Sequence, residues 1–222
     1  MAYQLHPENV DKDMNTVSQL IIMAPPLLLA LTLHEYAHGY VAYRLGDPTA
    51  RDAGRLTLNP LSHLDPIGTI AFFFIKFGWA KPVPVNPYYF KNPRKDMLWV
   101  ALAGPITNLL LAVASALLLK AMIGTATLIP YSTMLEAILV PLYNMLVASV
   151  WINLVLCIFN FLPIPPLDGG RILTGLLPEN LARTYASFER YGFIVILILA
   201  FSGVLGTVIF PVIRFANNLL LS

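Results

Sequence analysis

VSQLIIMAPPLLLALTLHEYAHGYVAY, residues 17–43, is the stretch of sequence that decides the fold. It is predominantly apolar over more than the roughly 20 residues that a helix needs to cross a bilayer. Three later apolar runs are also long enough, at about Leu98 to Ile123, Leu135 to Leu162 and Tyr191 to Ile213. Together the four runs predict an all-α polytopic membrane protein with about four transmembrane helices.

The composition indicates a chain that is immersed in lipid. Of its 222 residues, 57% are hydrophobic and 12% are charged, whereas a soluble domain carries about 25% charged residues. The formal net charge of +2 is too small to indicate a nucleic-acid partner. The only cysteine, Cys157, lies in an apolar run and can form no internal disulfide. The expected partner is therefore the lipid bilayer, and the oligomeric state stays open.

The chain between the first and second runs does not read as a regular spanning helix. Ile67 to Phe77 is apolar for only 11 residues, which is too short to span, and predicts a re-entrant or interfacial piece. The wider stretch from Gly54 to Phe90 alternates polar and apolar residues and predicts short strands or extended segments. Its prolines are Pro60, Pro66, Pro82, Pro84 and Pro87.

The distribution of Lys and Arg predicts the orientation. Of the 14 such residues, 11 lie in the connections between the first and second runs and between the third and fourth, which leaves 3 on the other side. Because cytoplasmic loops carry an excess of Lys and Arg, these two connections should be cytoplasmic and both termini outside. A crossing by Ile67 to Phe77 would change this assignment.

A His-Glu-x-x-His motif, at His34, Glu35 and His38, follows the apolar stretch Leu20 to Leu33 within the first run. On a helix, two histidines four residues apart share one face and can bind one Zn²⁺, and the glutamate is placed to take a proton from metal-bound water. The alternative is a pair of core histidines that hydrogen-bond between helices. The apolar surroundings disfavour it, since ionisable residues in a membrane span are costly and usually functional.

A catalytic zinc site needs a third protein ligand, and Asp168 is the best candidate. It is the only carboxylate between Glu136 and Glu179, and three prolines before it predict an extended segment in place of a helix. An ordinary aspartate in a loop turn is the alternative. The charge distribution, which uses neither motif, puts both histidines and Asp168 toward the same, cytoplasmic, side. The sequence thus predicts one Zn²⁺ per chain.

These residues resemble the site-2 protease family of intramembrane zinc metalloproteases. The resemblance rests on three motifs, His34 to His38, Gly104 to Asn108 (GPITN) and Asn160 to Gly170, which carries the family's Asn-x-x-Pro-x-Pro-x-Leu-Asp-Gly pattern. Arg55 to Pro66 looks like the branch of compact prokaryotic members. Larger members have a PDZ module or a nucleotide-binding regulatory module, and neither is evident in this sequence.

The resemblance implies that His34, His38 and Asp168 bind zinc and that Glu35 is catalytic. It also gives Asn160 the position of a family asparagine that helps to bind the substrate or the oxyanion.

Two further residues keep alternatives open. Asn108 either hydrogen-bonds between helices, which is the preferred interpretation, or belongs with Asn160 to a substrate or oxyanion site. His63 either approaches the zinc or helps to gate the site, or it is a solvated loop residue.

The expected function is hydrolysis of peptide bonds in or near transmembrane helices of membrane proteins, as in regulated intramembrane proteolysis. The substrate helix is expected to unwind locally, and a strand edge within residues 54–90 is one way to hold the unwound piece. The whole chain is expected to be one membrane-embedded domain in a prokaryotic cell membrane, with a polar segment 1–17, a catalytic core 18–175 and an additional transmembrane helix 191–213. A membrane zinc transporter and a catalytically inactive membrane binding protein are the alternatives.

Overall fold

The computed structural model describes residues 16–75, 78–126 and 132–222, and most of them are helical. Most of the predicted polar segment 1–17 lies outside these residues. The helices are α1 (Thr16–Arg44), α2 (Thr49–Asp52), η2 (Pro60–His63), α3 (Pro66–Ile75), η3 (Pro87–Tyr89), α4 (Pro93–Ala126), α5 (Thr133–Asn160), α6 (Asp168–Leu176), α7 (Glu179–Ser187), α8 (Glu189–Phe201) and α9 (Val204–Leu221).

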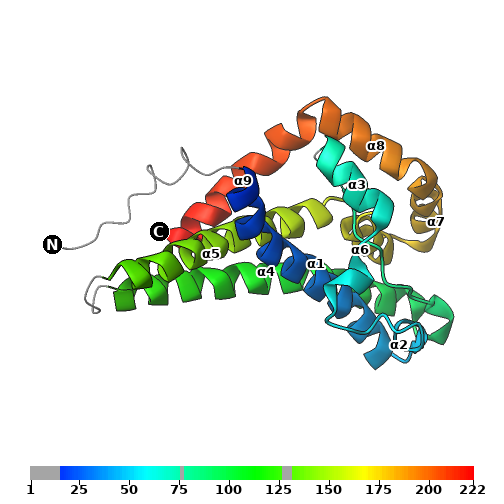
Figure 1. The fold of residues 1–222 in the computed structure, drawn as a ribbon. Helices are drawn as coiled ribbons and strands as arrows, with labels where there is room; N and C mark the ends of the chain where they lie inside the picture. Colours follow the sequence, from blue (N-terminus) through cyan, green and yellow to red (C-terminus); the bar gives the residue numbers. More distant parts are fainter. Residues whose placement is uncertain (1–15, 76–77, 127–131) are drawn as a thin grey trace.

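Four helices are long and apolar enough to cross a membrane, which confirms the predicted all-α, multi-pass architecture. They are α1, α4, α5 and α9. Helix α4 packs against α1 and α5, and α5 packs in turn against α9 (Figure 1). Small residues of α4 let the helices approach closely. The buried cluster between α4, α5 and α9 consists of Ala112, Ala116, Val150, Leu154, Ile209 and Ile213.

The predicted fourth span, residues 191–213, is wrong in its bounds. The structure divides this run into α8 and α9, because Gly203 between them has a φ of 78°, a left-handed conformation that favours glycine. Helix α9 is the spanning helix, and it extends to Leu221. Helix α8 has 13 residues and joins α7 at a bend of 61°. Apolar length alone did not reveal this break.

The segment between α1 and α4 follows its prediction in part. Helix α3 covers most of the short apolar run Ile67 to Phe77, whose last two residues lie outside the described chain. Residues 81–86 lie outside any helix, as expected, and Asn86 is extended, but the described residues contain no strand and only one isolated bridge, between Leu64 and Ala80. The predicted short strands are therefore wrong.

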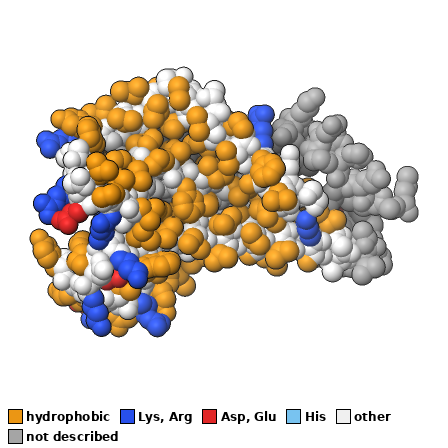
Figure 2. Space-filling model, turned by 180° about the vertical axis from the view of Figure 1, so that it is seen from behind, with side chains coloured by type: hydrophobic (Ala, Val, Ile, Leu, Met, Phe, Trp, Pro, Cys, Tyr) orange, Lys and Arg blue, Asp and Glu red, His pale blue; other side chains and the backbone are white. Residues whose placement is uncertain are grey.

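The surface matches a molecule surrounded by lipid. Figure 2 shows hydrophobic side chains over most of the visible face, with Lys and Arg concentrated toward one end. Large apolar side chains are well exposed on several helices, for example Ile21 at 61%, Leu117 at 64% and Phe215 at 72%. Soluble monomers rarely expose apolar surface on this scale, whereas a bilayer covers it.

Candidate metal centre

His34 and His38 lie one turn apart on the same face of α1, as their spacing requires. Both are buried, and their Nε2 atoms are 3.0 Å apart. Gly104 of α4 faces both rings: a Cβ atom on it would lie 2.4 Å from His38 Nε2 and 2.5 Å from His34 Cε1. The absence of a side chain at Gly104 therefore leaves the space that the two imidazoles occupy.

The other nitrogen of each imidazole is held by an oxygen that can only accept a hydrogen bond. His38 Nδ1 lies 2.7 Å from the carbonyl oxygen of Val100, and His34 Nδ1 lies 2.6 Å from Asn108 Oδ1. Each Nδ1 therefore carries a hydrogen and donates it. In the neutral rings, each Nε2 is then left with a bare lone pair.

A buried chain of hydrogen bonds fixes the orientation of Asn108. Its Nδ2 donates to Asn153 Oδ1 at 2.9 Å and to the carbonyl oxygen of Ala30 at 3.4 Å, so its Oδ1 must face His34. Asn153 Nδ2 donates in turn to the carbonyl oxygen of Ser149 at 2.9 Å. With both hydrogens of its Nδ2 engaged, Asn108 hydrogen-bonds between helices, which was the preferred interpretation.

The loop between α5 and α6 brings Asp168 to the histidines. Its three prolines keep residues 161–167 out of a helix. Most of the loop consists of turns, and Leu167, directly before Asp168, is extended as predicted. These turns pack tightly on the start of α6, since a Cβ atom on Gly169 would lie 2.2 Å from the carbonyl oxygen of Leu162. Helix α6 then begins at Asp168 itself.

Asp168 completes a compact group of three side chains. Its Oδ2 lies 3.2 Å from His34 Nε2 and 3.2 Å from His38 Nε2, and it is buried without a hydrogen-bond partner. The ionised carboxylate is the form in which an aspartate ligates a metal.

Two bare nitrogens and one carboxylate oxygen thus converge on one point. In the described part of the chain this is the single group of His, Cys, Asp or Glu residues whose ligand atoms lie within 4.8 Å of one another. Ligand atoms at the corners of a tetrahedral zinc site are roughly 3.3 Å apart, close to the separations here. Electron pairs that face each other repel unless a cation lies between them. The three residues therefore fit Zn²⁺, with one coordination position left open.

Glu35 lies on α1 between the two histidines and is also buried. Its Oε2 accepts a hydrogen bond of 2.9 Å from the backbone N–H of Val83, in the segment that precedes α4. The Val83 side chain packs on the same helix, because a Cβ atom on Gly39 would lie 3.1 Å from Val83 Cγ1. The segment thus covers α1 at the motif and orients the glutamate.

The structure does not bring the other two predicted residues into this group. Asn160 is the last residue of α5, and its Nδ2 donates to the carbonyl oxygen of Leu156 in the same helix. His63 is 1% exposed, so it is not a solvated loop residue, and its Nε2 donates to the carbonyl oxygen of Thr57 at 2.8 Å. Neither belongs to the metal-ligand cluster.

Two residues that support the site were not predicted from the sequence. Asn153 supports Asn108, and an asparagine inside the third apolar run was the signal that could have found it. Val83 contributes a backbone N–H, which nearly every residue possesses, so nothing in the sequence singles it out.

A comparison of the sequence with known proteins identifies its family. The model of "Peptidase family M50" matches residues 22–203. "Putative zinc metalloprotease YwhC" of Bacillus subtilis is 44% identical over 199 residues, which cover 88% of this chain and 87% of that protein. No solved structure matches.

Mycobacterial relatives are more distant. "Putative zinc metalloprotease Rip2" of Mycobacterium tuberculosis is 30% identical over 202 residues, 86% of this chain and 71% of that protein. The protein of the same name in Mycolicibacterium smegmatis is 28% identical over 194 residues, 85% of this chain and 70% of that protein. The names of these relatives include zinc, the metal ion that the three ligand atoms of this chain fit. The predicted resemblance is confirmed, and the chain belongs to peptidase family M50, the membrane-embedded zinc metalloproteases of the site-2 protease type.

Proposed function

We propose that this chain hydrolyses peptide bonds in or near the transmembrane helices of other membrane proteins. The observation that carries the proposal is the convergence of His34, His38 and Asp168 next to Glu35, on and beside a helix long enough to cross a bilayer. Ionisable groups in such a helix are costly, and a functional site is the usual reason for them.

Each of these residues has a distinct task in the proposed mechanism. His34, His38 and Asp168 would hold one Zn²⁺, which when bound lowers the pKa of a water molecule toward about 7 and polarises the scissile carbonyl. Glu35 would take the proton of the attacking water and pass it to the leaving amine. The hydrogen bond from the Val83 N–H keeps the Glu35 carboxylate in one orientation, as a general base requires.

A substrate helix would have to unwind locally, because a regular helix hides its carbonyls in its own hydrogen bonds. The structure gives no support to the idea that residues 81–86 hold the unwound substrate by strand addition. The N–H groups of Lys81 and Val83 already donate within the protein, and Pro82 and Pro84, on the opposite edge, have none. Side-chain contacts are therefore the better means of positioning the substrate.

The proposed active site faces the cytoplasm of a prokaryotic cell. The connections that follow α1 and α5, together with the adjoining ends of α1 and α4, carry 11 of the 14 Lys and Arg residues, and cytoplasmic loops favour these residues. The metal-ligand cluster lies where α1, α4 and the start of α6 meet, near the same connections.

The alternatives have less support. A zinc transporter needs ligands along a path through the membrane, whereas the described helices hold one compact group. An inactive binding protein would typically have lost Glu35 or one of the ligands, and all four residues are in place.

The decisive test is Glu35→Gln, which retains size and most hydrogen bonding but removes the basic carboxylate. We expect the variant to insert and to bind about one zinc per chain, while cleavage of a transmembrane peptide in detergent or liposomes falls at least about 10²-fold. Zinc content and cleavage are measured on the same preparation. Normal cleavage by a zinc-replete Glu35→Gln protein would refute the mechanism.

A further inference from the structure

A cavity of about 470 Å³ lies beside two segments that lead to the metal-ligand cluster, although neither Glu35 nor a metal ligand lines it. One wall contains Val83, whose N–H binds Glu35, and the opposite wall contains Gly170, two residues after Asp168. The cavity thus lies between the segment that orients the proposed base and the helix that begins at the proposed third ligand. Its volume is within the roughly 300–1,000 Å³ of sites that bind small ligands or short stretches of a larger one.

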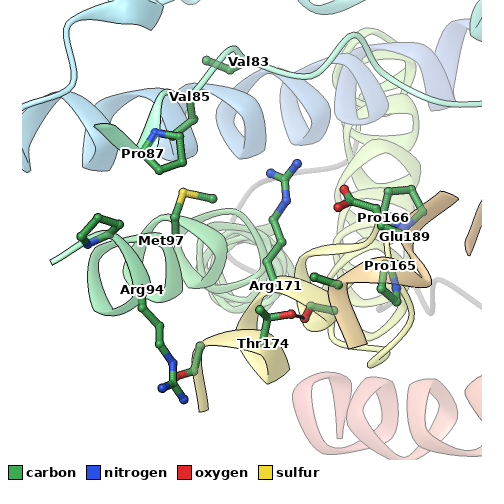
Figure 3. Close-up of a pocket in the computed structure, with 14 residues that line it drawn as sticks. Val83, Val85, Pro87, Arg94, Met97, Pro165, Pro166, Arg171, Thr174 and Glu189 are labelled. Carbon is green, nitrogen blue, oxygen red and sulfur yellow. Dashed lines mark hydrogen bonds between the residues drawn. The ribbon is translucent and has the colours of Figure 1, made fainter. Parts of the chain in front are cut away.

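The lining of the cavity is mostly apolar. Valine, methionine and proline side chains contribute most of it, and three charged residues join them, Arg94, Arg171 and Glu189. Figure 3 shows Arg171 extending from α6 into the cavity, toward the segment that contains Val83 and Val85.

The two arginines differ in what they bind. Arg94 Nε donates to the carbonyl oxygen of Gly175 at 3.0 Å, at the edge of the cavity. Arg171 forms no ion pair or hydrogen bond with any residue of the described chain, although Glu189 lines the same cavity. Arg171 is exposed, so its donors are open to a ligand, and a guanidinium can bind a carboxylate through two parallel hydrogen bonds.

We infer that this cavity binds the stretch of substrate that flanks the cleaved peptide bond, and that Arg171 selects substrates with an acidic side chain there. The inference rests on the proposed function. A polypeptide bound at Glu35 and the metal ligands would lie near Val83 and Gly170, and its neighbouring side chains would then be within reach of the cavity. A carboxylate of the polypeptide is favoured over a lipid headgroup because the cavity lies beside the segments that contact Glu35 and continue Asp168, where a bound substrate must be held.

The test is a scan of the substrate for charge. A single-pass model peptide carries Glu or Gln, one position at a time, at each residue that flanks the cleaved bond. With the zinc-loaded full-length protein, kcat/KM for Glu over Gln should be at least about 10-fold at one or two adjacent positions. In Arg171→Gln this ratio should fall toward 1, and in Arg171→Glu a Lys peptide should become the preferred one. Arg183→Gln, an exposed arginine of α7 that pairs with Glu179, is the matched control and should keep the parental ratio.

A measurement without turnover separates this inference from the proposed function. In zinc-loaded Glu35→Gln protein, a photo-crosslinking residue at Thr174 should capture the Glu peptide more than the Gln peptide, and Arg171→Gln should abolish the difference. Arg171-dependent capture without cleavage by the parent would contradict the proposed function and leave the cavity's role standing. The inference would be overturned by cleavage without a preference for Glu, or by a preference for Glu that survives Arg171→Gln. It would also be overturned if added phosphatidylglycerol abolished the preference for Glu, and that result would identify a lipid headgroup as the occupant.

Discussion

At the scale of single residues, Gly104 has the most direct influence on the metal-ligand cluster. An added Cβ atom would meet the imidazole rings at 2.4–2.6 Å, closer than such contacts allow, while the helix backbone of α4 cannot easily move away. We therefore expect Gly104→Ala to displace His34 and His38 and to weaken zinc binding by about 10-fold or more, measured by chelator competition. Gly124→Ala is the control, because it lies on the same helix and its Cβ would meet nothing within 4 Å. Equal zinc affinity of the two variants would contradict this account.

Asn153 acts on the metal-ligand cluster through Asn108. Without the acceptor of Asn153, the Asn108 amide loses the partner that holds its Oδ1 toward His34 Nδ1. We expect Asn153→Ala to weaken zinc binding about 10-fold, the lower end for residues that orient a metal ligand. Ser115→Ala, which removes only a hydroxyl contact to Ser149 farther along the chain of hydrogen bonds, should change the affinity little. If Asn153→Ala binds zinc like the parent, the orientation of Asn108 does not depend on Asn153.

The same residues show how far sequence reasoning reaches into the site. His34, Glu35 and His38 follow from helical spacing, and Asp168 follows from the need for a third ligand. That Asn108 hydrogen-bonds between helices was the preferred interpretation, but its partner His34 did not follow, because an amide in a span can face any neighbouring helix and only tertiary packing decides which. The tautomers of the histidines depend on Val100 and Asn108, 62 and 74 residues away in the chain.

At the scale of elements, α8 positions the loop that carries Asp168. A Cβ atom on Gly192 would lie 1.6 Å from the carbonyl oxygen of Pro165, so only a glycine lets α8 pack on this loop. The sequence predicted a spanning helix here, since one long helix and two shorter ones have the same apolar length. The close contact between Gly192 and Pro165 joins residues that are distant in sequence and could not be predicted from hydropathy.

This packing predicts that Gly192→Ala separates α8 from the loop. We expect a loss of about 1–3 kcal/mol in stability, as for other overpacked sites, seen as a lower midpoint of thermal unfolding in detergent. Zinc affinity should fall with it, because the loop ends at Asp168. Gly206→Ala on α9 serves for comparison, since its Cβ would meet only the flexible side chain of Phe210 at 3.1 Å. A Gly192→Ala protein with the parental midpoint and zinc affinity would show that α8 does not hold the loop.

At the scale of the whole molecule, the number of crossings follows from where α9 ends. Lys120 Nζ donates a hydrogen bond of 2.6 Å to the backbone oxygen of Ser222, so the end of α9 lies beside the far part of α4, which leads to α5. Helix α5 crosses back from the side of the membrane where α4 ends. One further crossing, by α9, brings the chain to that side again. The bent pair α7 and α8 therefore does not add a fifth span. This agrees with the four spans that hydropathy predicted, although one of them was misplaced.

Orientation then follows from charge, and it can be tested on the same molecule. In a Cys157→Ser background, which removes the native cysteine, Arg51→Cys and Arg183→Cys should react with a membrane-impermeant maleimide only when it reaches the cytoplasmic side. Thr125→Cys and Ser222→Cys should react from outside, because α4 and α9 end together. Labelling of positions 51 and 183 from opposite sides would mean that the chain crosses between them an odd number of times, against the two crossings by α4 and α5. Uniform labelling of positions 51 and 183 from outside would keep the fold but invert it, and would place the metal-ligand cluster on the outer side despite the positive charge of its connections.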